Sequence, residues 1–115
     1  MKRNFVIFLI MGLMMGSNGF CHPPSDIVGS FDSQTKLLKA QIKHASSNPG
    51  RHYIERVEIF LNGKQIISHK ISKQADASEQ SVTYQITDIK KGDKLTVEAY
   101  CNISGVMKKT IEVEK

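Results

Sequence analysis

The 115-residue sequence nowhere shows the three- and four-residue spacing of apolar side chains that an amphipathic helix needs. It also lacks internal repeats and low-complexity tracts, which excludes a repeat array and a long disordered linker. Its long apolar run, residues 5–15, falls short of the ~20 apolar residues that a membrane-spanning helix requires. A chain of this length forms one domain at most, so these absences favour a single β-rich domain.

A concentrated basic face is also missing. The lysines are scattered along predicted strands and turns, without a cluster and without interleaved aromatic residues, although the formal net charge is +5. Proteins that bind nucleic acids need a concentrated basic surface, so we exclude that class of function. The positive charge instead indicates a solvated basic surface.

Residues 1–21 have the composition of a secretory signal peptide. Lys2 and Arg3 supply the positive start, and residues 5–15 supply an apolar segment of the usual length. We therefore predict a periplasmic or secreted protein, with residues 22–115 as the mature domain and no stable membrane span after processing. Removal of the two basic residues lowers the formal net charge from +5 to +3.

Two cleavage positions satisfy the rule that small residues occupy the last and third-last positions of a signal peptide. Cleavage after Gly19 uses Ser17 and Gly19, and cleavage after Cys21 uses Gly19 and Cys21. A lipid anchor on Cys21 is a third outcome, although the bulky Phe20 stands where lipoprotein signals carry a small residue. If Cys21 is retained, it is a possible disulfide partner for Cys101.

The remaining residues alternate between apolar and polar side chains in short segments separated by turn signals. Asn62 and Gly63 form the two-residue sequence most typical of a β-hairpin turn. Seven strands are predicted, at residues 27–31, 36–44, 52–61, 65–71, 81–87, 94–102 and 106–113. Seven short strands at this spacing predict an all-β fold, a seven-stranded immunoglobulin-like β-sandwich.

His44 and Cys101 each continue the apolar, inward face of a predicted strand, because side chains on one face recur every second residue. The preceding residues on these faces are Leu38, Ala40 and Ile42 for His44, and Leu95, Val97 and Ala99 for Cys101. Each alone is more typical of a hydrogen-bonded core histidine or an inert buried cysteine. Together they form a candidate metal site, since imidazole and thiolate ligands suit zinc, iron or copper.

His69, in contrast, is predicted to be an exposed residue and not a ligand. A two-residue turn at Asn62 and Gly63 pairs residues whose numbers sum to 125, which places His69 opposite Arg56. The same face carries Glu58, a residue typical of the solvent-facing side of a strand.

Two segments resemble a known family. Residues 100–105, Y-C-N-I-S-G, resemble the Y-C-N-x-H-G signature of superoxide reductases, the iron domain shared by neelaredoxins and desulfoferrodoxins. Residues 52–63, H-Y-I-E-R-V-E-I-F-L-N-G, resemble the H-Y-I-x-W-I-E-L segment of the same family. The resemblance covers essentially the whole mature chain. It implies an immunoglobulin-like sandwich that holds a mononuclear iron through four histidines and an axial cysteine thiolate.

The ligand set that the resemblance implies is incomplete in this chain. His22, His44, His52 and Cys101 match the family's ligands in chain order, and they are the candidate metal ligands. The second histidine of the signature is replaced by Ser104, whose hydroxyl is a poor iron ligand. The implied activity is the reduction of superoxide to hydrogen peroxide with electrons from an unknown donor. Copper and zinc are alternative ions for the altered site.

Further departures from the family lie next to the histidines. The Glu-Lys pair that precedes the family's first ligand is absent before His22, so the lysine that steers the anion is missing. Ala45 replaces a proline after His44, and the loop from His44 to His52 is two residues longer than the usual spacing. These differences bear on catalysis more than on the fold.

The sequence leaves three classes of function open. The first is a superoxide-reductase-like metalloenzyme with an altered iron site. The second is a non-catalytic immunoglobulin-like module that binds a protein or a small molecule. The third is a periplasmic copper binder, in which cleavage after Cys21 makes the amino group and imidazole of His22 a chelate for copper.

Overall fold

The computed structural model describes residues 22–114, so the predicted signal peptide and Cys21 lie outside the described residues. Within this range the chain is all-β, and it contains no helix long and apolar enough to cross a membrane. The strands are β1 (Asp26–Asp32), β2 (Leu37–Lys43), β3 (Ile54–Leu61), β4 (Lys64–Lys70), β5 (Glu79–Gln85), β6 (Lys94–Cys101) and β7 (Val106–Glu112). Every predicted strand is present, with ends that differ by at most two residues.

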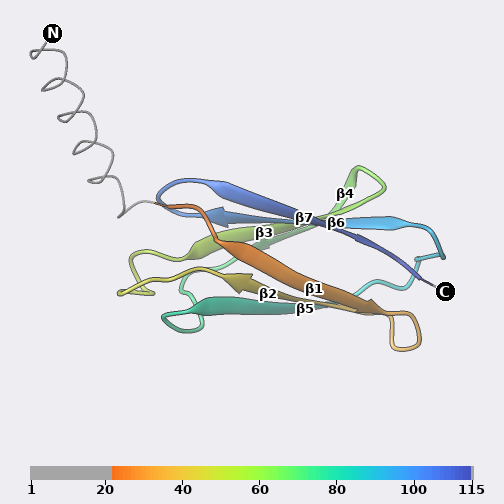
Figure 1. Cartoon of the computed structure of the whole chain (residues 1–115), viewed down its shortest axis with the longest axis horizontal. Helices are drawn as coiled ribbons and strands as arrows, with labels where there is room; N and C mark the ends of the chain where they lie inside the picture. Colours follow the sequence, from red (N-terminus) through yellow and green to blue (C-terminus); the bar gives the residue numbers. More distant parts are fainter. Residues whose placement is uncertain (1–21, 115) are drawn as a thin grey trace, which may run out of the picture.

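Two antiparallel sheets face each other, one with the strand order β1-β2-β5 and the other with the order β4-β3-β6-β7 (Figure 1). This arrangement confirms the predicted seven-stranded immunoglobulin-like sandwich. The alternating strand directions place the end of β2, the start of β3 and the end of β6 at the same end of the molecule, where β1 also begins.

The core lies between the sheets and follows the alternation of the strands. In β2, Leu38, Ala40 and Ile42 are buried, whereas Lys39 and Gln41 point to solvent. The other core residues are Ile27, Ile54, Val57, Ile59, Val82, Ile86, Ile89, Leu95, Val97, Ala99 and Val113. A slip of one residue would turn such a strand inside out, so the apolar pattern fixes the register and thereby the position of each strand end.

The turn between β3 and β4 forms as predicted, but the register of the two strands beyond the turn differs from the prediction. Asn62 and Gly63 have φ angles of 50° and 87°, the two positive values that this kind of hairpin turn requires. A β-bulge then shifts the β3–β4 register between Ile59 and Phe60. One extra residue on β4 moves every later pair by one position.

His69 therefore lies opposite Val57, and the prediction that it faces Arg56 is wrong. His69 is exposed, as predicted, yet its Nδ1 lies 2.7 Å from the hydroxyl of Tyr84 in the other sheet. Burial raises the pKa of Tyr84 to about 12, so this hydroxyl keeps its proton at neutral pH and forms a hydrogen bond with the imidazole. The pair joins the two sheets along β4 and β5, and His69 is not part of the group formed by the other histidines.

Candidate metal centre

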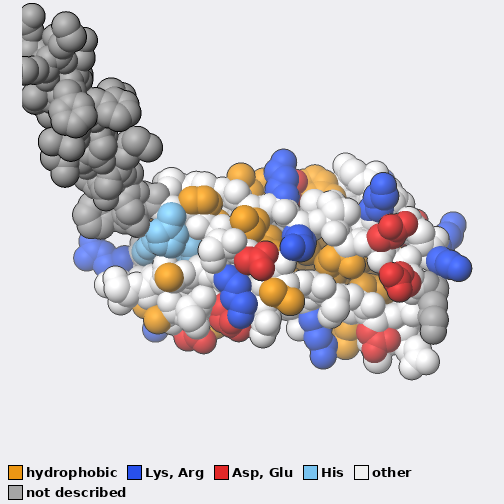
Figure 2. Space-filling model, in the orientation of Figure 1, with side chains coloured by type: hydrophobic (Ala, Val, Ile, Leu, Met, Phe, Trp, Pro, Cys, Tyr) orange, Lys and Arg blue, Asp and Glu red, His pale blue; other side chains and the backbone are white. Residues whose placement is uncertain are grey.

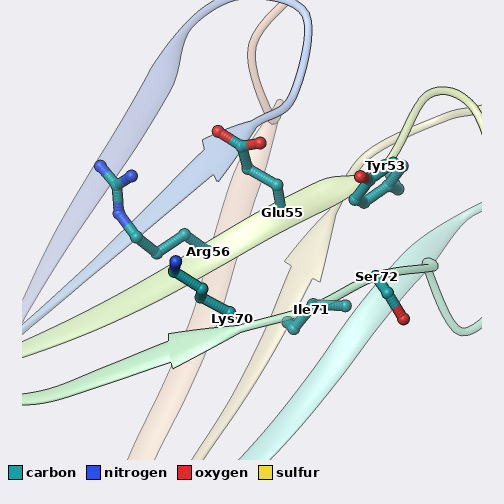
Figure 3. Close-up of a pocket in the computed structure, with 6 residues that line it drawn as sticks. All are labelled: Tyr53, Glu55, Arg56, Lys70, Ile71 and Ser72. Atoms are coloured by element: carbon teal, nitrogen blue, oxygen red, sulfur yellow. The ribbon is translucent and has the colours of Figure 1, made fainter.

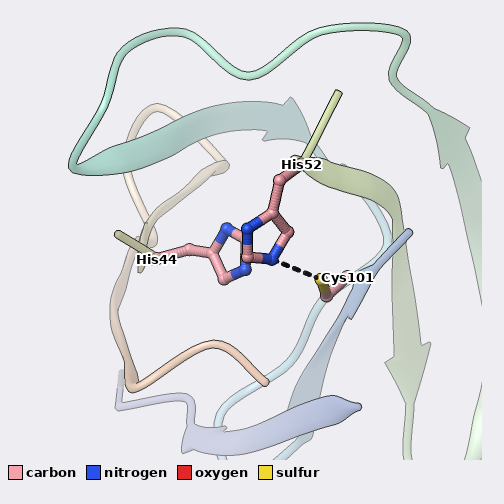
Figure 4. A group of neighbouring side chains, drawn as sticks. All are labelled: His44, His52 and Cys101. Atoms are coloured by element: carbon pink, nitrogen blue, oxygen red, sulfur yellow. Dashed lines mark hydrogen bonds between the residues drawn. The ribbon is translucent and has the colours of Figure 1, made fainter. Parts of the chain in front are cut away.

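Four side chains converge at one end of the sandwich. His22 precedes β1, His44 follows β2, His52 precedes β3 and Cys101 ends β6. Histidine side chains gather on the surface at this end (Figure 2). The side chains of His44, His52 and Cys101 point toward one another (Figure 4), and one ligand atom from each lies within 4.8 Å of the others.

His52 and Cys101 are in direct contact. Nε2 of His52 lies 3.1 Å from Sγ of Cys101, because β3 pairs with β6 and Ile54 lies opposite Cys101. The backbone N–H of Ile103 also donates to this sulfur, at 3.4 Å. Cys101 is 6% exposed and forms no disulfide within residues 22–114.

His44 is a fully buried polar residue with one unsatisfied atom. Its ring lies 4.6 Å from the ring of His52, measured between centroids, and its Nδ1 is 2.7 Å from Oε1 of Gln74. Its Nε2 has no hydrogen-bond partner among the described residues. Leaving a buried polar atom unpaired costs about 1–3 kcal/mol, so a ligand that binds Nε2 would offset this cost.

His22 lies beside this group. The centroid of its ring is 5.6 Å from that of His44 and 5.7 Å from that of His52. Its Nδ1–H donates to the carbonyl oxygen of Pro23 at 3.1 Å, which leaves Nε2 as the nitrogen with a lone pair. The structure thus places all four predicted ligands together, while metal binding itself stays a prediction.

The surroundings of His52 favour its neutral form. Burial, followed by repulsion from His44 and His22 when they are protonated, holds the pKa of His52 below its usual value of 6.5. Metal ions bind the neutral form of imidazole, so this shift reduces the competition from protons.

Asn102 links the two segments that carry His52 and Cys101. Its Oδ1 accepts from the backbone N–H of Tyr53 at 2.9 Å, and its Nδ2 donates to the carbonyl of Arg51 at 2.9 Å. Its backbone N–H donates to the carbonyl of Tyr53 at 2.9 Å. These three hydrogen bonds hold the turn after β6 against the residues before β3, which gives the asparagine of Y-C-N a structural role.

Gly105 gives the N-terminal segment its close approach to the same turn. Gly105 has a φ angle of +91°, and a Cβ atom added there would lie 2.4 Å from Cβ and 2.8 Å from Cα of Pro23. Only glycine allows both this backbone conformation and this contact. The glycine therefore sets where Pro23, and with it His22, meets the cluster.

We predict that Gly105→Ala destabilises the fold more than Gly92→Ala does. Gly92 also has a φ angle of +91°, but an added Cβ would meet nothing within 4 Å. Backbone strain alone costs about 1–2 kcal/mol at either site. The clash with Pro23 adds to it, for a total of about 3 kcal/mol at Gly105. Urea unfolding of both variants measures the difference, and equal losses would show that Pro23 does not pack on Gly105.

Ser104 lies in the exposed turn after Cys101. The cluster therefore has three imidazoles and one thiol, and a hydroxyl stands where the family signature has its last histidine. Ser104 is exposed to solvent, so its hydroxyl is not a buried substitute for the missing histidine.

A surface hollow of about 560 Å³ lies along β3 and β4 (Figure 3). Its lining residues are Tyr53, Glu55, Arg56, Lys70, Ile71 and Ser72. The side chains of Arg56 and Lys70 do not converge on one point in this view. The charge of Arg56 is already paired, because its Nε lies 2.9 Å from Glu58 and its guanidinium lies 4.0 Å from the centroid of the Tyr100 ring. The candidate centre is therefore the histidine–cysteine cluster and not this hollow.

The family model for desulfoferrodoxin matches residues 30–110, which is more than half of the chain. The chain belongs to the desulfoferrodoxin family. The match includes His44, His52 and Cys101 and also Ser104, and it begins after His22. The resemblance read from the two sequence segments is thereby confirmed.

Solved structures with a similar fold include two superoxide reductases. The superoxide reductase (1Fe-SOR) from Giardia intestinalis is 18% identical, with a TM-score of 0.60 over 80% of this chain and 97% of that chain. A mutant of the neelaredoxin-type superoxide reductase from Archaeoglobus fulgidus, in its reduced form, is 13% identical, with a TM-score of 0.47 over 84% and 94% of the two chains. A search of curated protein sequences finds no match. The similarity to the Giardia protein supports the fold of this desulfoferrodoxin-family domain.

One residue that contacts the cluster has no signal in the sequence. Gln74 lies in a polar loop, where a single glutamine carries no signal of burial, and yet it is 1% exposed and bonded to His44. The asparagine and glycine of the Y-C-N-I-S-G segment were recognised as part of a signature, but their contacts with Tyr53 and Pro23 were not predicted.

Proposed function

We propose that this member of the desulfoferrodoxin family is an exported, superoxide-reductase-like protein with a mononuclear metal centre held by His22, His44, His52 and Cys101. The observation that carries the proposal is the buried Nε2 of His44. It has no hydrogen-bond partner within residues 22–114, and it belongs to a cluster whose other members are metal-ligand side chains. A metal ion would accept the lone pair of this nitrogen and would bind the neighbouring ligand atoms as well.

The donor set fits a metal ion. Neutral imidazoles and a thiolate are ligands for iron, zinc and copper. The Nδ1 atoms of His22 and His44 are engaged with acceptors, so each ring presents Nε2 as its lone-pair nitrogen. The sulfur of Cys101 lies 3.1 Å from Nε2 of His52 and within reach of the same ion, and its thiolate would be the form that binds a metal.

The residues of this chain would have two roles in a reductase site, holding the metal ion and attracting the superoxide anion. A ferrous ion held there would supply one-electron redox chemistry, the reduction of superoxide with two protons to hydrogen peroxide, and an external one-electron donor would be needed for turnover. Cys101 and the histidines would hold the ion at one end of the sandwich. The net positive charge of the mature domain attracts the superoxide anion, in the absence of a lysine before His22.

A four-coordinate zinc or copper centre is the second candidate. It is favoured by one observation, the exposed Ser104 at the position of the family's fifth ligand, which leaves four protein donors. Four nitrogen and sulfur donors match the tetrahedral preference of zinc, which has no redox chemistry. A zinc centre of this kind would stabilise the fold, and the chain would then act as a non-catalytic module.

Intact mass and metal content of the purified protein test export and metal binding in one sample. We expect an exported chain that begins at Phe20 or His22 and carries one metal equivalent, which is iron for the reductase and zinc or copper for the second candidate. Cytoplasmic protein that retains Met1 would contradict export. A chain that is metal-free and takes up no added ion would contradict the centre. Copper bound through an N-terminal His22 alone would identify the chelate instead.

A further inference from the structure

Gln74 is a buried polar residue that contacts the candidate centre and is not itself a ligand candidate. It lies between β4 and β5 and is 1% exposed, although Lys73, Ala75 and Asp76 beside it are all exposed. Burying an amide is costly unless its polar atoms are all paired. Its hydrogen bonds therefore show why the chain places it there.

Its contacts fix the orientation of the Gln74 amide. Nε2 lies 2.8 Å from the carbonyl oxygen of His44 and 2.8 Å from that of Asp76. Carbonyl oxygens only accept, so the NH₂ group must face them. Oε1 lies 3.2 Å from the backbone N–H of Ile54, which only donates. A flipped amide would lose all three hydrogen bonds and place like groups against each other.

The oxygen of this amide therefore faces Nδ1 of His44 at 2.7 Å. An amide oxygen accepts only, so Nδ1 must carry the proton. In the neutral ring the lone pair then lies on Nε2, the buried atom that lacks a hydrogen-bond partner in the part of the chain described. The amide thus determines which nitrogen of His44 is free to bind a cation.

Gln74 also connects the two segments that bring the histidines together. Its side chain bonds to the carbonyl of His44 after β2 and to the N–H of Ile54 at the start of β3, two residues after His52. Its backbone N–H donates to the carbonyl of Pro49, in the loop between the two histidines. A single side chain therefore sets both the tautomer of one ligand candidate and the spacing of the segments that carry the pair.

We infer that Gln74 is a positioning residue of the metal centre, which holds His44 in its Nδ1–H tautomer so that Nε2 is presented to the ion. This inference rests on the proposed metal binding. Outer partners of this kind typically contribute 10–100-fold to metal affinity.

The test compares wild type with Gln74→Met and with Gln80→Met as the matched control. Gln80, in β5, accepts from the N–H of Ala75 at 2.8 Å and donates to the carbonyl of Ser81, and within residues 22–114 its side chain has no hydrogen bond to a histidine. Nitrogen-15 NMR of the metal-free protein reports the tautomer of His44. Titration with Co²⁺ against a chelator reports affinity, and urea unfolding reports stability.

We expect the Nδ1–H tautomer of His44 in wild type and in Gln80→Met, with equal Co²⁺ affinity. In Gln74→Met we expect a mixture of tautomers and 10–100-fold weaker Co²⁺ binding. If Gln74→Met keeps both the tautomer and the affinity, or if wild type holds the Nε2–H tautomer, the inference is wrong.

Two further outcomes keep the test decisive. Gln74→Glu preserves the acceptor for Nδ1, so it should retain the tautomer even if Gln74→Met fails to fold, and an Nε2–H tautomer in Gln74→Glu would overturn the inference. Wild type that binds no Co²⁺ would refute the metal centre and with it the role of Gln74 in metal binding. The NMR arm would then still report whether the amide sets the tautomer, so the two failures are distinguishable.

Discussion

Cys101→Ser is expected to abolish tight metal binding while the sandwich stays folded. The substitution replaces a soft thiolate with a hydroxyl of similar size that stays protonated, and a hydroxyl is a poor ligand for iron, zinc or copper. The loss of affinity should exceed the ~10–100-fold that follows removal of an outer partner of a ligand. The sulfur-to-metal charge-transfer absorption seen with added iron or Co²⁺ should disappear with it.

The matched control for Cys101→Ser is His69→Gln. His69 is exposed, is bonded to Tyr84 and does not belong to the ligand group, so its removal leaves the cluster intact. Metal titration, absorption spectra and urea unfolding of both variants separate the effects. Cys101→Ser protein that is folded and binds metal as wild type does would show that Cys101 is only a buried core residue.

Alternation along the strands was sufficient to predict the sandwich and half of the cluster. His44 and Cys101 could be placed because each continues a face whose earlier members, such as Ile42 and Ala99, had to be buried. The burial of both residues is now established. Period-two patterns carry this information because a strand that buries one face has no freedom of register.

Contacts between residues outside the strands could not be predicted in the same way. The bulge that moves His69 to Val57 depends on how β3 and β4 fit the rest of the sheet, and the turn sequence does not encode it. Gln74 reads as one more polar residue in a polar loop, and its burial follows only from the loop folding over His44. The contact between Gly105 and Pro23 joins residues far apart in the chain, so no local sequence pattern predicts it.

These unpredicted contacts all lie beside the histidine–cysteine cluster, and each of them positions one of its side chains or the segment that carries it. Gln74 acts on His44, Asn102 joins the segments of His52 and Cys101, and Gly105 sets the approach of the N-terminal segment. The strands bring the ligand candidates to the end of the sandwich, and the loops then fix their orientation. A centre built in this way tolerates a change in an exposed turn residue better than a change in the residues that orient its ligands.

Ser104→His should therefore complete a set of four histidines and one thiolate without disturbing the core. Ser104 is exposed and occupies the position of the last histidine in the Y-C-N-x-H-G signature. Among residues 22–114, Lys36 and Asn62 are the non-glycine residues with positive φ, so the backbone at Ser104 accepts histidine without strain. An added imidazole ligand should tighten ferrous binding by at least about 10-fold, or ~1.4 kcal/mol.

Iron stoichiometry, the thiolate-to-iron charge-transfer band and superoxide consumption would be measured for wild type and Ser104→His side by side. Ile103→His is the control, because Ile103 is 51% exposed in the same turn but adds a histidine at the wrong position of the signature. We expect all three signals to rise in Ser104→His, to stay at the wild-type level in Ile103→His, and to vanish when Cys101→Ser is combined with Ser104→His. Wild type that already equals the variant would show that Ser104 is no defect. If no variant binds iron, restoring the fifth ligand does not restore the site. The similarity to superoxide reductases would then be limited to the fold.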